Sequence, residues 1–161
     1  DVNLNPKLGA MWSRRGEQVA IPTPGQNRKR YLAGALDAHR GTILYTEGES
    51  KDTDLFLRLL EVAERHHVRR FKRLYVILDN YRIHSSRVAR AWLTNHPRIR
   101  LLFQPAYHPW VNAIERLWKA MHDTVTRNHR YSTLDQLMRA VRRFLHVAQP
   151  FPGSQHALAR A

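Results

Sequence analysis

The sequence has no cysteine, no long hydrophobic run and few acidic residues. The absence of cysteine excludes disulfide bonds and thiolate metal sites, and it is compatible with a reducing cytoplasm. No apolar run approaches the roughly 20 residues that span a bilayer, so we expect no membrane partner. The polar opening, Asp1–Pro6, does not resemble a signal peptide. Because this opening also lacks a methionine, we expect the natural N-terminus to lie upstream.

The scarcity of acid leaves a large positive charge. Against 13 Asp and Glu stand 27 Lys and Arg, which gives a net charge of +14. A surplus of this size favours a polyanionic partner, because neutralising phosphates releases condensed counterions. Nucleic acid is the leading candidate, with acidic membranes or ribosomal assembly as alternatives. The apolar fraction of 43% and the charged fraction of 25% are those of a folded globular domain.

The first part of the chain has the pattern of short antiparallel strands. Turn-forming residues separate them, and the expected strands are Val2–Leu4, Gln18–Thr23, Arg30–Ala38 and Thr42–Glu47. The last two flank the turn at His39–Gly41 and therefore predict a β-hairpin.

The second part alternates helices with strands. Asp52 or Thr53 can begin a helix, Ser85 or Ser86 a second, Asn112 a third, and the pair Thr133 and Gln136 a fourth. Between them lie two apolar strands, 74–78 and 99–103, the first expected to be covered on both faces.

This order predicts an α/β fold with a mixed sheet of about five strands and helices on both faces. Periodicity alone also permits other α/β sandwiches. We assign residues 1–149 to this domain and 150–161 to a C-terminal tail.

Asp79 is the first candidate for chemistry. It follows the apolar strand Leu74–Leu78, so the strand places a carboxylate at its C-terminal end, where ligands gather in open α/β sheets. The alternative is that Asp79 and Asn80 only begin a turn or cap the next segment.

Glu115 is the second candidate. It lies on the expected helix beside an apolar stripe, and most glutamates so placed belong to a solvated face. The preceding segment 104–112 contains two prolines and two aromatic residues. Such a loop can direct the carboxylate towards the end of a neighbouring strand.

These residues belong to a wider pattern. Leu78-Asp79-Asn80, with His84 five residues after the Asp, precedes a P-x-Y-x-P-x-x-N-x-I-E-x-x-W segment that begins at Pro105. Thirty-five residues separate Asp79 from Glu115. With the upstream stretches 4–9 and 31–35, the sequence resembles the mariner-related bacterial insertion-sequence transposases, whose catalytic domain is a DDE-type RNase H-like fold. The resemblance covers nearly the whole chain.

The resemblance implies that Asp79 is the second catalytic Asp and Glu115 the closing Glu. The matching accompanying positions are Asn80, His84, Tyr107, Pro109 and Asn112. The chain departs from the pattern at His108 and Ala113, where the family usually has Ser and Pro, and neither change removes a metal ligand. The first catalytic Asp is expected about three residues ahead of the position of Asp1, so the first strand is expected to be truncated. Asp1 itself is the alternative.

The resemblance further implies Mg²⁺ or Mn²⁺, two ions held by Asp79 and Glu115, because these hard cations prefer oxygen ligands. Two such ions activate the attacking group and stabilise the leaving oxygen of a phosphodiester. Implied partners are transposon-end and target double-stranded DNA and a second copy of the chain in a homodimer. The expected location is the bacterial cytoplasm, at the nucleoid. The alternatives are a related nuclease without strand transfer and a non-catalytic DNA-binding or dimerisation remnant.

Other residues carry weaker hypotheses. His84 contacts DNA, positions a carboxylate or lies on the approach to a helix. Asn112 caps the helix of Glu115 or contacts substrate. Further candidates for DNA contact are Asn80, His108, Trp110, Arg116, Lys119 and the basic run 69–73. For Trp110 the alternative is packing against a partner subunit. For Arg116, Lys119 and the run 69–73 it is a solvated surface position.

Overall fold

The computed structural model describes residues 1–69, 71–105 and 112–151. Its first sheet has three antiparallel strands in the order β1 (Val2–Asn3), β2 (Lys29–Leu36) and β3 (Ile43–Gly48). Gly41, in the turn between β2 and β3, has a φ of 69°, a backbone conformation that glycine adopts without steric cost. The predicted hairpin is therefore confirmed.

The second sheet consists of the parallel pair β4 (Leu74–Leu78) and β5 (Ile99–Phe103). The expected single sheet of about five strands is wrong, because the described residues form separate sheets of three and two strands. The physical reason is the length of β1. Its two residues pair only with Arg30 and Lys29 of β2, so no strand bridges the first sheet to β4.

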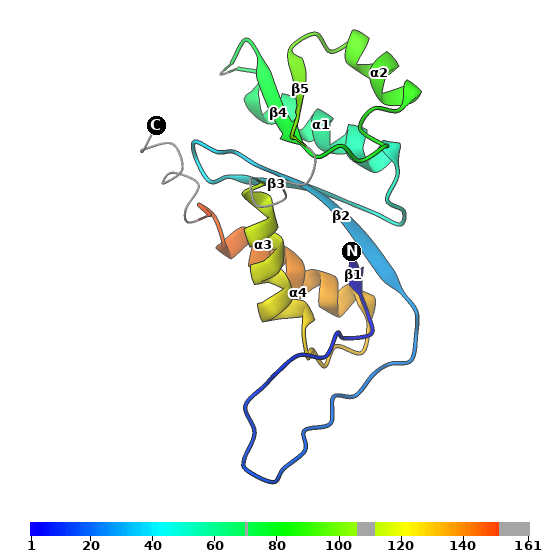
Figure 1. The fold of residues 1–161 in the computed structure, drawn as a ribbon, viewed down its shortest axis with the longest axis vertical. Helices are drawn as coiled ribbons and strands as arrows, with labels where there is room; N and C mark the ends of the chain where they lie inside the picture. The colour runs from blue at the N-terminus through cyan, green and yellow to red at the C-terminus, as the bar shows by residue number, and fades with distance from the viewer. Residues whose placement is uncertain (70, 106–111, 152–161) are drawn as a thin grey trace.

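Two helices cover one face of the three-stranded sheet (Figure 1). They are α3 (Ile114–Met121) and α4 (Leu134–Val147), joined through a π-helical turn at His122–Thr126. Their apolar faces enclose the larger core together with β1 and the inward residues of β2 and β3. Its buried members are Val2, Leu4, Ile43, Ile114, Leu117, Met121, Leu134, Leu137, Met138, Val141 and Leu145.

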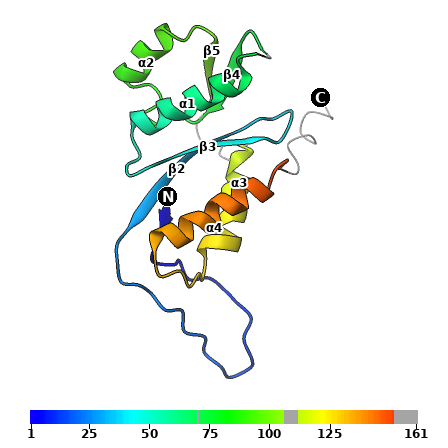
Figure 2. The same cartoon turned by 180° about the vertical axis from the view of Figure 1, so that it is seen from behind.

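Helix α1 (Thr53–His67) lies on the opposite face of the three-stranded sheet, as Figures 1 and 2 both show. Leu55, on the side of α1 that meets this sheet, lies next to Gly48 of β3. Phe56 and Leu60 belong instead to a second core with α2 (Arg87–Thr94), β4 and β5. Helices on both faces are thus confirmed for the first sheet.

The strand β4 is covered on one face only within the described part of the chain. Leu74, Val76 and Leu78 pack towards α1 and α2, whereas the side chains of Tyr75 and Ile77 are exposed by 56% and 62%. The prediction of a strand buried on both faces is therefore wrong. A continuous apolar run does not show which side the fold leaves open.

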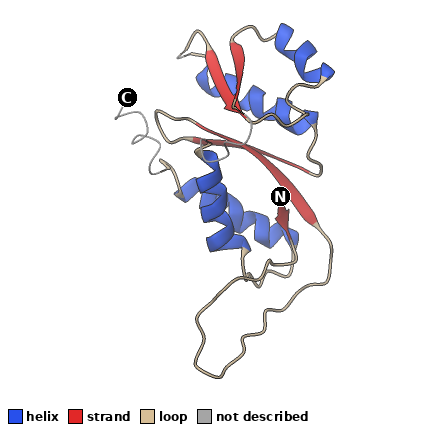
Figure 3. Ribbon diagram, viewed as in Figure 1, coloured by secondary structure: helices blue, strands red, loops and turns tan. Residues whose placement is uncertain are grey.

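The long segment before β2 is irregular, as the tan trace of Figure 3 shows. The strand predicted at Gln18–Thr23 is absent from it. The segment is held at Gly9, whose backbone N–H and carbonyl both bond the side chain of Asn128, at 2.9 Å each. Beside it, the carbonyl of Lys7 accepts a bond from the N–H of Asn128 at 3.1 Å, in an isolated β-bridge between Lys7 and Arg127. The side-chain amide and this single bridge thus fix the segment.

Helix starts agree with the sequence. Asp52 caps α1 by accepting a bond from the N–H of Leu55, and Ser86 caps α2 in the same way from Ala89. Thr133 caps α4 by accepting from the N–H of Gln136. These caps satisfy N–H groups that have no partner inside the helix.

At the C-terminal end, the described chain continues past α4. The N–H of Phe151 donates to the carbonyl of Gly41 at 2.9 Å, and its ring packs against the larger core. The rest of the expected tail, 152–161, lies outside the described residues. Within residues 1–69, 71–105 and 112–151, no helix combines the length and apolar character of a membrane span.

Gly34 in the middle of β2 generates a prediction. A Cβ at this position would lie 2.6 Å from Cζ2 of Trp118, so the absent side chain lets α3 approach the sheet. We expect Gly34→Ala to lower the free energy of unfolding by about 1–3 kcal/mol through overpacking. Urea unfolding, followed by tryptophan fluorescence, measures this change in the free energy of unfolding.

A double-mutant cycle with Trp118→Phe provides the control. If the clash is with the indole ring, the smaller ring should reduce the penalty of the alanine, giving a coupling energy that non-contacting sites lack. Strictly additive effects would show that Trp118 is not the group that Gly34 accommodates.

Burial of three histidines generates a second prediction. Burial lowers the pKa of His67, against the opposing effect of Asp37, and also lowers the pKa values of His122 and His129. The unfolded chain, with histidines near their ordinary pKa of about 6.5, therefore binds protons more readily than the folded one. The stabilisation of the folded chain by its neutral, buried histidines is present above the unfolded pKa. It is lost as the pH falls through the lower pKa values of these histidines in the folded chain.

We expect the urea midpoint to decrease between about pH 7.5 and 5.5, a window above the titration of ordinary carboxylates. The variant His67→Gln should flatten this dependence. An unchanged midpoint across the window would contradict the prediction.

Candidate functional site

Asp79 lies directly after β4, at its C-terminal end, as the sequence predicts. Its side chain is 67% exposed. Oδ1 accepts a bond from the N–H of Tyr81 at 3.1 Å, which closes a local turn. This turn is the alternative proposed from sequence, and here it coexists with an accessible carboxylate, because the bonds of the described residues use only Oδ1.

His84 supports this carboxylate. Its Nδ1 lies 3.1 Å from Oδ1 of Asp79 and 3.2 Å from the carbonyl oxygen of the same residue. The side chain is only 16% exposed, and its ring packs on Phe56 of α1 with centroids 4.5 Å apart. Of the roles considered from sequence, this geometry matches that of positioning a carboxylate.

Asn80 and Gln104 connect the ends of β4 and β5. The side-chain amide of Asn80 donates to the carbonyl of Gln104 at 2.8 Å, and the N–H of Gln104 donates to the carbonyl of Leu78 at 2.9 Å. Gln104 is buried, with 8% of its surface exposed. Asn80 is therefore a structural clamp that fixes the backbone on which Asp79 lies.

Glu115 lies in the first turn of α3 and is exposed. The neighbouring Ile114 and Leu117 are buried in the larger core, so they orient the helix and leave the carboxylate on an accessible side. Asn112 precedes the helix. Its Oδ1 accepts a bond from the N–H of Ile114 at 3.4 Å, although the helix boundary falls at Ala113, which makes no side-chain cap.

The remaining predicted residues are placed as follows. Arg116 and Lys119 are exposed on α3, and Nζ of Lys119 donates to Asp123 at 2.6 Å. This ion pair, together with Arg127, lowers the pKa of the Asp123 carboxyl. His108 and Trp110 lie outside the described residues.

The described residues do not form a complete metal centre. Residues 1–69, 71–105 and 112–151 contain no group of three or more His, Cys, Asp or Glu side chains that could hold a metal ion. The convergence of Asp79 and Glu115 stays a prediction, since the segment that joins β5 to α3 falls largely within 106–111.

Lys51 lies beside the turn of Asp79. Its ammonium is 4.1 Å from the ring centroid of Tyr81, two residues after Asp79. A cation therefore neighbours the turn that carries the candidate carboxylate.

Sequence reasoning missed two supporting residues. Nothing in the sequence marks Phe56 as more than an apolar residue, yet its ring packs against His84. Gln104 is predicted only as the first residue of the loop 104–112, yet it binds both β4 and Asn80. For Gln104 a signal existed, since a polar side chain between an apolar strand and a proline is a candidate for a bonded position.

The fold of this chain is shared by two solved structures. One is the Mos1 transposase paired-end complex with left transposon end, at TM-score 0.60 and 17% identity. The other is the Mos1 mariner paired-end complex with Mn, at TM-score 0.61 and 16% identity. Each likeness covers 99% of this chain and 53% of the other. The chain thus has the RNase H-like α/β fold of these transposases.

Sequence comparison gives the family. Residues 1–138 match the family described as DDE superfamily endonuclease, and the chain belongs to it. It is also 49% identical over 160 residues to the insertion element IS630 uncharacterized 39 kDa protein of Shigella sonnei. The match covers 99% of this chain and 46% of the relative, so the chain spans about half the length of this curated protein. The resemblance stated from sequence is confirmed.

The clamp between Asn80 and Gln104 generates a prediction. Asn80→Ala removes the donor to a buried residue's carbonyl, so we expect a loss of stability of about 1–3 kcal/mol. Hydrogen exchange at the N–H of Gln104 should accelerate, because the ends of β4 and β5 separate more often. Tyr81→Phe is a control that leaves the clamp intact, and equal exchange rates in both variants would contradict the assignment.

Proposed function

We propose that this chain is the catalytic part of a transposase that cuts transposon ends and joins them to target DNA, with Asp79 and Glu115 as metal-binding carboxylates. The observation that carries the proposal is the turn after β4. There an exposed carboxylate is held by His84 and a backbone N–H at the C-terminal end of a parallel strand, in a chain of the DDE endonuclease family.

The donor set fits a hard divalent cation. Mg²⁺ is usually bound by one or two carboxylates and otherwise keeps its waters. Asp79 offers Oδ2, which has no bonding partner among the described residues, and Glu115 offers an exposed carboxylate. Mg²⁺ or Mn²⁺, as a pair of ions, would polarise the phosphodiester and activate the attacking oxygen. One of the two Mos1 complexes is a complex with Mn, which agrees with this choice.

The chain's own residues orient the first carboxylate. His84 and the N–H of Tyr81 fix the rotamer of Asp79, and Asn80 fixes the strand end beneath it. The fixed carboxylate does not have to be ordered when substrate binds, which lowers the free-energy cost of assembling the site. The resemblance to the insertion-sequence transposases implies a further catalytic carboxylate upstream of Asp1, on the chain that continues into β1.

The partner proposed is double-stranded DNA, as transposon end and as target. A net charge of +14 on 161 residues offsets the repulsion between a carboxylate site and phosphates. Both Mos1 structures are paired-end complexes, which supports two copies of this chain acting together as a homodimer. The expected location is chromosomal DNA in the bacterial cytoplasm. The domain would comprise residues 1–149, with 150–161 as a tail.

A cleavage assay tests the proposal. The protein, extended by its natural upstream residues, is incubated with Mg²⁺ and a labelled duplex that carries the ends of its own element. We expect Asp79→Asn and Glu115→Gln each to lower the cleavage rate more than about a hundredfold. His84→Ala should lower it about 10–100-fold, the usual effect of losing a residue that orients a ligand.

Matched controls separate these effects from surface charge. Asp135→Asn changes an exposed acid in the first turn of α4, as Glu115→Gln does in α3, and Glu61→Gln changes an exposed acid of α1. Both should cleave at the unmodified rate. Full activity of Asp79→Asn or Glu115→Gln would overturn the proposal, and cleavage without joining of a 3′-hydroxyl end would identify a nuclease.

A further inference from the structure

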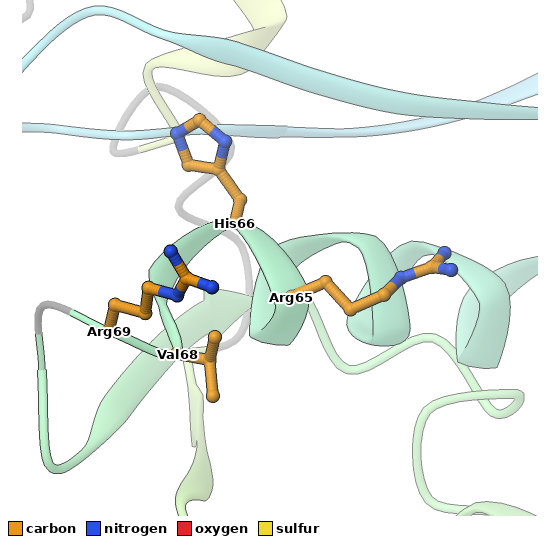
Figure 4. Close-up of a pocket in the computed structure, with 4 residues that line it drawn as sticks. All are labelled: Arg65, His66, Val68 and Arg69. Atoms are coloured by element: carbon orange, nitrogen blue, oxygen red, sulfur yellow. The ribbon is translucent and has the colours of Figure 1, made fainter.

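A basic hollow lies at the C-terminal end of α1, and Figure 4 shows the four residues that line it. Its volume is about 550 Å³, and it is lined by Arg65, His66, Val68 and Arg69. A second hollow of about 340 Å³ shares Val68 and Arg69 and adds Phe71, Lys72 and Arg98. Because two residues line both, the hollows form one continuous surface, here called the α1 basic surface.

Only one of its cations is needed for the fold. Arg98 donates to the carbonyl oxygens of Val68, at 2.8 Å, and of Phe71, and so satisfies acceptors at the end of α1. A helix C-terminus carries about half a negative charge, which this guanidinium already offsets. The fold therefore leaves the other cations of the surface without a structural task.

Those other cations have no acidic partner. Within the described part of the chain, Arg65, Arg69 and Lys72 are exposed and make no ion pair. Figure 4 shows the Arg69 side chain directed towards His66, while Arg65 extends along α1 in the other direction. Arg69 lines both hollows, Arg65 only the first and Lys72 only the second, so the unpaired cations are spread over the α1 basic surface. An anion with several separated charges would neutralise them together.

The surface is distant from Asp79 along the sheet. It flanks the start of β4, whereas Asp79 follows the end of this strand. At about 3.3 Å per residue, the five residues of β4 separate the two places by about 17 Å. This length of duplex axis carries about ten phosphate charges, so the two places would meet different phosphates.

We infer that the α1 basic surface binds the phosphate backbone of double-stranded DNA as a second contact, separate from the carboxylate site. Arg65, Arg69 and Lys72 supply the charge, and the hollow admits the sugar–phosphate ridge. This contact does not recognise a base sequence. It offers cations and apolar side chains, and no helix or strand among the described residues of the surface is available to enter a DNA groove. The identity of the polyanion as DNA rests on the proposed function.

The test measures DNA binding without metal. The protein with its upstream residues is titrated in EDTA with a labelled duplex of arbitrary sequence over a range of salt concentrations. For Arg65→Gln/Arg69→Gln/Lys72→Gln we expect the slope of log K against log salt to decrease in magnitude by between about two and three, since each phosphate contact contributes about 0.9. Affinity at about 0.1 M salt should decrease at least tenfold.

A control of equal charge change is Arg87→Gln/Arg139→Gln/Arg143→Gln, on exposed positions of α2 and α4. It should change the slope much less. Arg65→Lys/Arg69→Lys keeps the charge and should retain the slope. Equal losses in the two glutamine triples would overturn the inference, because net charge alone would then account for binding, and so would preferential binding of polyglutamate over duplex.

The two proposals fail separately. The slope is measured in EDTA and does not depend on cleavage, so inactive Asp79→Asn protein can be titrated equally well. An unchanged slope in the α1 triple refutes the second contact while leaving the carboxylate site untouched. A reduced slope together with full cleavage by Asp79→Asn supports the contact and refutes the proposed chemistry.

Discussion

The packing of α1 between the two sheets is the interaction on which the rest of the structure depends. Leu55 lies against β3 on one side of the helix, while Phe56 and Leu60 enter the core shared with β4, β5 and α2 on the other. Because the two sheets share no hydrogen-bonded strand among the described residues, α1 holds β4 in place relative to the hairpin. It also carries Phe56, which supports His84 and through it the Asp79 carboxylate.

The site end and the basic end of this arrangement are built by different means. At the end of β4, His84 holds Oδ1 of Asp79 and Asn80 bonds the carbonyl of Gln104, which fixes the backbone and one carboxylate oxygen. At the end of α1, Arg98 is bonded to two carbonyls, whereas Arg65, Arg69 and Lys72 make no ion pair with any described residue. A fixed carboxylate suits chemistry at one atom, whereas unpaired cations suit a repeating polyanion that can bind in many registers.

Several parts of this protein could be predicted from local chemistry. The caps at Asp52, Ser86 and Thr133 follow from side chains that accept bonds from N–H groups two or three residues on. The hairpin follows from its turn, and the position of Asp79 follows from the apolar strand before it. Membership of the DDE superfamily was indicated by spacing over nearly the whole chain and is confirmed.

By itself, the sequence determined the order of elements, the helix starts and the family, because these depend on neighbours in the chain. Only the tertiary structure decided that β4 pairs with β5 alone within the described part of the chain, that Tyr75 and Ile77 stay exposed, and that 18–23 is irregular. It also decided the support of Asp79, since Phe56 and His84 are 28 residues apart. The type of an apolar residue predicts that it tends to be buried. Which residue it packs against depends on how the whole chain is arranged in space.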